Sequence, residues 1–223
     1  MAATPPPLPL VSRDVELAHL HAMLTATAAG TGGCTVVTGP PGIGKTRLVD
    51  AAVREAATLG IATAAGKAKE LDRIAPLATL MGTLRRTAPD TLDLDPLRGH
   101  EGDRFWYIDR IGELLEVYVA KQPLLIAIDD AQWADEFSVL ALRVLVPALS
   151  SSPLRWVFAR RPVPTPSPAQ DTLDWLVADG ADEIRPGLLG EAAVAQLKIG
   201  LLLANAFKGL AQETSRTAPK PAA

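Results

Sequence analysis

Short apolar runs bounded by glycine, proline or charged residues recur along this chain of 223 residues. Runs of this length and composition predict β-strands that are buried on both faces. The clearest run is 123–129, with sequence Pro-Leu-Leu-Ile-Ala-Ile-Asp. Further strands are predicted at 33–39, 61–65, 154–160 and 181–185, of which 61–65 carries the weaker pattern.

Between these runs, apolar residues recur at the three- and four-residue spacing of amphipathic helices. Helices are predicted from about residue 12 and over 44–59, 76–87, 103–121, 135–149 and 168–179. The first would bury a stripe of Val15, Leu17, Leu20 and Leu24, and the helix over 103–121 a stripe of Phe105, Ile108, Ile111, Leu115 and Val119. Because strands alternate with helices, we expect an α/β fold, a three-layer α/β/α sandwich around a mainly parallel sheet.

The predicted elements divide the chain into three parts. Residues 1–10 contain four prolines and are expected to form a flexible leader. Residues 11–197 would form the folded core. The tail, 198–223, ends in Thr-Ala-Pro-Lys-Pro-Ala-Ala and is expected to be partly disordered.

Composition narrows the function classes. The net charge of −3 argues against broad electrostatic attraction to nucleic acid or anionic lipid, so we expect neither direct DNA binding nor membrane association. The single cysteine excludes an intramolecular disulfide, and the three histidines lack zinc-ligand spacing. Without a basic secretory leader or a membrane-length apolar run, the expected location is the cytoplasm.

The segment 39–46, Gly-Pro-Pro-Gly-Ile-Gly-Lys-Thr, fits the phosphate-binding pattern G-x4-G-K-[ST] between a predicted strand and a predicted helix. Its glycines would let successive backbone N–H groups surround a phosphate at the helix start. Lys45 would contact the β- and γ-phosphates, and the Thr46 hydroxyl would bind Mg²⁺. An ordinary Gly/Pro turn is the alternative, which the strand–loop–helix context disfavours. The residues expected to bind the nucleotide are Gly39, Gly42, Ile43, Gly44, Lys45, Thr46 and Arg47.

Two acids, Asp129 and Asp130, follow the clearest predicted strand. In a parallel sheet this places them at the carboxyl edge, beside the phosphate-binding loop. Asp129 would hold Mg²⁺ through water, and Asp130 would orient the water that attacks the γ-phosphate. Two acids after a strand can also form a solvated turn, but their combination with the upstream loop favours the functional interpretation.

Three segments resemble a known family. Residues 10–17, Leu-Val-Ser-Arg-Asp-Val-Glu-Leu, are similar to the N-terminal segment of signal-transduction ATPases with numerous domains (STAND). The loop and residues 128–135, Ile-Asp-Asp-Ala-Gln-Trp-Ala-Asp, resemble the Orc1-like AAA-type ATPase domain of large LuxR-type regulators. Residues 157–162 resemble the family's fourth strand, which implies that Arg161, or else Arg160, senses the γ-phosphate. The resemblance covers about 10–197.

The resemblance implies a regulatory domain that binds ATP or ADP with Mg²⁺ and hydrolyses ATP slowly to switch conformation. Downstream of Leu197 the sequence shows no lid, winged helix or DNA-binding helices of the family, so we expect a nucleotide-binding core without these parts. The apolar segment 199–207 could then drive self-association. The alternatives are a small-molecule P-loop kinase and a remnant that binds nucleotide without turnover.

Two further residues have plainer interpretations. Cys34 lies in the predicted strand 33–39 and is expected to be a core residue, because no histidine is near it in sequence. Trp133 is expected to pack against the protein, with stacking on the adenine base as the alternative.

Overall fold

The computed structural model describes residues 11–85, 104–162, 165–190, 194–195 and 198. It divides into two compact units. The larger unit, 15–187, contains the sheet and its covering helices. The smaller unit joins 1–14 to 188–223.

The sheet has five strands in the order β2-β3-β4-β1-β5, and every neighbouring pair is parallel. Strand β3 and strand β4 are buried along their whole length, which explains their mainly apolar sequences. This arrangement confirms the predicted parallel α/β fold. The strands are β1 (Gly33–Thr38), β2 (Ala62–Lys67), β3 (Leu124–Asp129), β4 (Leu154–Arg160) and β5 (Asp182–Ile184).

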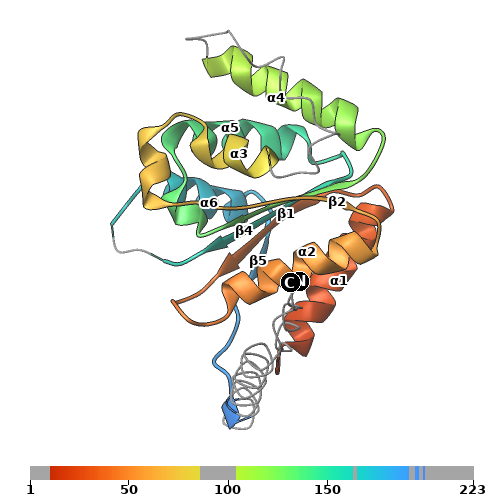
Figure 1. Cartoon of the computed structure of the whole chain (residues 1–223), viewed down its shortest axis with the longest axis vertical. Helices are drawn as coiled ribbons and strands as arrows, with labels where there is room; N and C mark the ends of the chain where they lie inside the picture. The colour runs from red at the N-terminus through yellow and green to blue at the C-terminus, as the bar shows by residue number, and fades with distance from the viewer. Residues whose placement is uncertain (1–10, 86–103, 163–164, 191–193, 196–197, 199–223) are drawn as a thin grey trace, which may run out of the picture. The chain divides into compact units, whose positions relative to one another are not determined.

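Helices cover both faces of the sheet and form the outer layers of the predicted three-layer sandwich (Figure 1). Helices α1 (Asp14–Ala28) and α2 (Lys45–Thr58) lie on one side, and α3 (Ala78–Leu84), α5 (Glu136–Ala148) and α6 (Pro168–Ala178) lie on the other. Helix α4 (Arg104–Val119) packs against α5. Two short 3₁₀ helices, η1 (Glu70–Ile74) and η3 (Ala131–Trp133), follow β2 and β3.

The predicted apolar stripes are wrong at two positions. Val15 is 81% exposed and Phe105 is 70% exposed. Both residues lie in the first turn of their helices, whereas the buried residues begin at Leu20 in α1 and at Ile108 in α4. The spacing of apolar residues therefore identifies which face of a helix packs against the protein. It does not show at which residue along the helix that packing begins.

Several element limits also differ from the prediction. Strand β2 runs to Lys67 instead of ending at residue 65, and η1 follows it where no helix was predicted. The predicted leader, 1–10, and the apolar segment 199–207 lie outside the described residues, as do residues 86–87 of the predicted helix over 76–87. Within the described ranges, every helix is too short or too polar to cross a bilayer.

Candidate functional site: a phosphate loop beside paired carboxylates

The loop between β1 and α2 depends on its glycines. Gly42 and Gly44 have φ values of 78° and 103°, a region that other residues enter at a cost. A Cβ atom at Gly39 would lie 2.9 Å from Cγ2 of Ile43. Gly44 is the N-cap of α2, so the loop leads directly into a helix start, where the first backbone N–H groups have no acceptor within the helix.

An open cavity of about 410 Å³ lies over this loop. Its volume falls in the range of small-molecule sites. Gly39 and Ile43 shape the loop without lining the cavity. The lining residues are Pro41, Gly42, Gly44, Lys45, Thr46, Arg47, Asp130 and Arg161.

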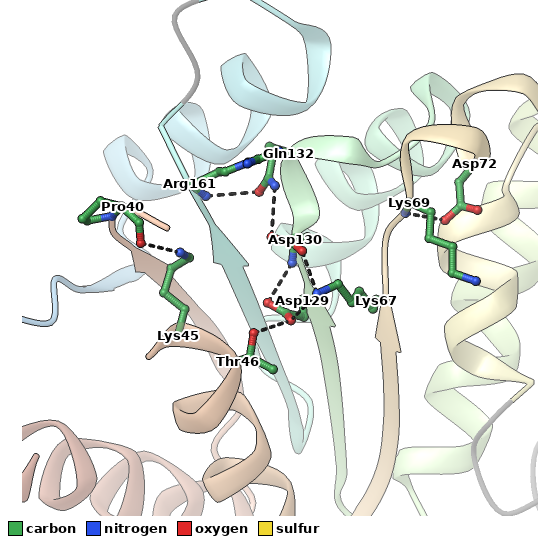
Figure 2. A network of polar contacts seen from close by, with 10 residues as sticks. All are labelled: Pro40, Lys45, Thr46, Lys67, Lys69, Asp72, Asp129, Asp130, Gln132 and Arg161. Carbon is green, nitrogen blue, oxygen red and sulfur yellow. Dashed lines mark hydrogen bonds and ion pairs between the residues drawn. The ribbon is translucent and has the colours of Figure 1, made fainter. Parts of the chain in front are cut away.

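Lys45 is directed along the loop at the start of α2. Its Nζ donates a hydrogen bond to the backbone oxygen of Pro40 at 3.0 Å (Figure 2). Burial lowers the pKa of the Lys45 amine, although the carboxylates of Asp130 and Asp129 act in the opposite direction. The Lys45 amine has one hydrogen-bond partner among the described residues, the neutral carbonyl of Pro40. Its remaining N–H groups can therefore donate to a phosphate in the cavity.

Thr46 and Asp129 bring two oxygen ligands together across 83 residues of sequence. The Thr46 hydroxyl donates to Oδ2 of Asp129 at 2.7 Å, and Oδ1 of Asp129 accepts the backbone N–H of Asp130 at 2.9 Å. Asp129 is 5% exposed. A hydroxyl and a carboxylate are the hard donors that Mg²⁺ prefers, and Mg²⁺ usually takes its other ligands from water and phosphate. The donor set therefore fits Mg²⁺.

Asp130 projects into the cavity from a left-handed backbone conformation, φ 49°. Its Oδ2 forms an ion pair of 2.8 Å with Nζ of Lys67, and its Oδ1 accepts a hydrogen bond of 3.1 Å from Gln132. Burial raises the pKa of Asp130, but the hydrogen bonds from Lys67 and Gln132 and the charges of Lys67 and Arg161 together hold the pKa below its usual value. The same contact raises the pKa of Lys67.

Sequence reasoning missed Lys67 and Gln132. Lys67 ends β2 and stands opposite Asp129 in the register of β2 and β3. The signal was its position two residues beyond the weakly predicted strand 61–65, and only the pairing of β2 with β3 brings it to the acids. Gln132 is fully buried and connects two strands, since its amide binds Asp130 and its Oε1 accepts the backbone N–H of Arg161 at 3.1 Å.

The two candidate arginines have different surroundings. Arg160 is buried, pairs with Asp174 at 2.6 Å and donates to Thr38 at 3.1 Å. Arg161 lines the cavity, and its Nε is buried without a hydrogen-bond partner among the described residues. The structure thus places Arg161, and not Arg160, at the candidate site.

Solved structures of low sequence identity share this fold. Cdc6p from Pyrobaculum aerophilum matches with a TM-score of 0.66 and 15% identity, over 88% of this chain and 51% of that chain. The Aeropyrum pernix ORC2 protein, solved in ADPNP-ADP complexes, matches with a TM-score of 0.56 and 16% identity, over 83% and 50%. The Aeropyrum pernix ORC1 protein, solved in complex with DNA, matches with a TM-score of 0.57 and 16% identity, over 87% of this chain and 50% of that chain. This chain spans about half the length of these proteins.

A comparison with curated proteins finds no match. A family model described as an AAA ATPase domain matches residues 9–157, which include the phosphate loop, Asp129 and Asp130. The match covers well over half of the chain. The chain therefore belongs to the AAA ATPase domain family.

Proposed function

We propose that this domain binds Mg-ATP and ADP in the cavity over the phosphate loop and acts as a slowly hydrolysing regulatory switch of the STAND/LuxR type. The observation that carries the proposal is the meeting of Lys45, Thr46, Asp130 and Arg161 around one cavity, with Asp129 hydrogen-bonded to the hydroxyl of Thr46. The solved Aeropyrum pernix ORC2 protein binds ADPNP and ADP, which supports a nucleotide as the ligand. The regulatory assignment rests on the resemblance of 10–17 and 128–135 to that family.

In this proposal, the loop N–H groups, Lys45 and Arg47 bind the phosphates. Thr46 and Asp129 hold Mg²⁺, which when bound neutralises charge on the β- and γ-phosphates. Asp130 orients water at the γ-phosphate, and Arg161 contacts the γ-phosphate and so distinguishes ATP from ADP.

The surroundings of Asp130 support slow turnover. Both of its carboxylate oxygens have partners, Lys67 and Gln132, and its pKa is lowered. A carboxylate of lowered pKa is a weaker general base, and one held by an ion pair must leave that partner to meet a water. Slow hydrolysis suits a switch, whose output is the bound state rather than the product.

The Aeropyrum pernix ORC1 protein was solved in complex with DNA, but we do not propose DNA binding for this chain. Its net charge of −3 supports a domain without direct DNA contact. The kinase alternative has no observation in its favour, because the site is accounted for by residues that position phosphate, Mg²⁺ and water.

Steady-state phosphate release tests the proposed activity. We expect release from Mg-ATP without any added acceptor, at well below about 1 s⁻¹, the low end of ordinary enzymes. ADP formation that requires a small-molecule acceptor, with the γ-phosphoryl group transferred to that acceptor and no phosphate released, would contradict the switch and favour a kinase. Release of about 10 s⁻¹ or more would contradict a switch whose base is restrained by Lys67.

A further inference from the structure

Trp133, the last residue of η3, has a guanidinium group from each of two separate segments over its ring. Cζ of Arg161 lies 5.1 Å from the ring centroid, and Cζ of Arg73, from η1, lies 4.9 Å from it. Both distances are within the range of cation–π attraction. We propose that Trp133 is a positioning residue that holds the guanidinium of Arg161 at the nucleotide cavity. This inference rests on the proposed γ-phosphate role of Arg161.

Arg161 needs such a support. Gln132 fixes its backbone N–H, but the Nε of its side chain has no hydrogen-bond partner among the described residues. Contact with an aromatic face restrains a guanidinium without using its N–H groups, because those groups lie in the plane of the cation. The ring can therefore hold Arg161 in place while its donors remain directed to a phosphate oxygen.

The indole is itself held in place. The backbone N–H of Trp133 donates to the backbone oxygen of Asp130 at 3.0 Å, and the indole is half-buried against the core. Arg73 donates to the backbone oxygen of Gln132 at 3.3 Å, which fixes η3 from the side of η1. Trp133 thus keeps a set position relative to both Asp130 and Arg161.

Trp133 does not line the cavity, whereas Arg161 does. A direct role in stacking on the base, the alternative left by the sequence, therefore has no support in this structure. The tryptophan acts through the arginine.

The test compares the affinity for a non-hydrolysable ATP analogue with the affinity for ADP, both with Mg²⁺, by titration calorimetry. Trp133→Leu should reduce the preference for the ATP analogue about three- to tenfold, the size of one cation–π contact, and leave ADP affinity unchanged. Trp133→Phe keeps an aromatic face and should restore part of the preference. Trp175→Leu is the matched control, because Arg143 lies 4.9 Å from that ring and neither residue lines the cavity.

Four results decide whether Trp133 positions Arg161. In combination with Arg161→Met, Trp133→Leu should cause no further loss of preference. If Trp133→Leu weakens both ligands equally, or if Trp133→Phe behaves like Trp133→Leu, the indole has a merely structural role and the inference is wrong. If Arg161→Met itself leaves the preference intact, the proposed role of Arg161 fails, and the inference fails with it.

Discussion

Asp129 and Asp130 are adjacent in sequence and share Lys67, whose Nζ lies 3.4 Å from Oδ2 of Asp129 and 2.8 Å from Oδ2 of Asp130, but their other partners differ. Asp129 is buried and accepts from the Thr46 hydroxyl, whereas Asp130 lines the cavity and accepts from Gln132. The left-handed backbone at Asp130 turns the chain sharply after β3 and lets the two side chains diverge. The sequence predicted both acids from their place after an apolar strand, but the role of each remains a prediction.

Replacing each acid by its amide should separate these roles. Asp129→Asn removes a charge from the proposed Mg²⁺ ligands and should weaken Mg²⁺-dependent nucleotide binding by about tenfold or more. Asp130→Asn should keep binding within about twofold and reduce phosphate release by about a hundredfold, as expected for loss of a base. Calorimetry and phosphate release measure the two effects. Wild-type turnover in both variants would contradict the assignment.

Cys34 was expected to be a core residue, and the structure confirms this. It is 8% exposed within β1, and burial raises the pKa of its thiol to about 12, although the nearby Arg155 charge acts in the opposite direction. The neutral thiol is therefore favoured in the folded state. The thiolate is the reactive form, so the native protein should react very slowly with a thiol reagent at pH 8.

The same shift predicts a pH effect on stability. The folded pKa is raised, so the stabilisation is fully present below the ordinary pKa of 9.0 and is lost as pH rises through about 12. The free energy of unfolding should fall more steeply between pH 9 and 11 in the wild type than in Cys34→Ala. Urea titrations at several pH values measure the difference. Parallel pH profiles would show that the thiol ionises equally in both states.

At the scale of elements, Asp135 connects two helices that the sequence treated separately. Asp135 begins the helix predicted over 135–149, and in the structure it is the N-cap of α5, where its carboxylate accepts the backbone N–H of Ser138 at 2.9 Å. The buried carboxylate also accepts the Ser138 hydroxyl and the backbone N–H groups of Leu77 and Thr79, at 2.8 and 3.0 Å. It therefore fixes the start of α3 against α5.

Asp135→Ala should destabilise the domain by about 3 kcal/mol or more, because it leaves several buried donors without a partner. The matched variant is Ser167→Ala, which removes a cap that accepts one N–H, from Gln170 at 3.2 Å. Ser167→Ala should lower the free energy of unfolding by about 1 kcal/mol. Urea denaturation with unchanged m-values measures both changes. Equal losses would mean that the contacts of Asp135 to α3 contribute nothing.

The contacts of Asp135 show which interactions can be predicted from the sequence and which cannot. A cap is local, since donor and acceptor lie within one turn, so its pattern is visible in the chain. The contacts to Leu77 and Thr79 span more than fifty residues and require the packing of α3 on α5. Lys67 was missed for the same reason, because its contacts with Asp129 and Asp130 depend on strand register.

At the scale of the whole larger unit, the parallel sheet assembles the site. All five strands run in one direction, so the ends of β1, β2, β3 and β4 meet at one edge. There β1 leads into the phosphate loop, β3 carries the acids and β4 leads to Arg161. The sequence allowed prediction of the loop and the acids, because each follows a recognisable strand, and the resemblance of 157–162 to the family's fourth strand implied the arginine. It could not predict which arginine faces the cavity, since that depends on the partners of Arg160.

The central claim is that the cavity over the loop binds Mg-ATP. Calorimetric titration of wild type, Lys45→Ala and Lys121→Ala with Mg-ATP tests it most directly. Lys45 lines the cavity, whereas Lys121 is an exposed lysine in the turn after α4, so the two variants lose the same charge at different places. We expect Lys45→Ala to lose at least about a hundredfold in affinity with the unfolding free energy nearly unchanged, and Lys121→Ala to bind like the wild type. Equal affinity of all three proteins for Mg-ATP would contradict the account.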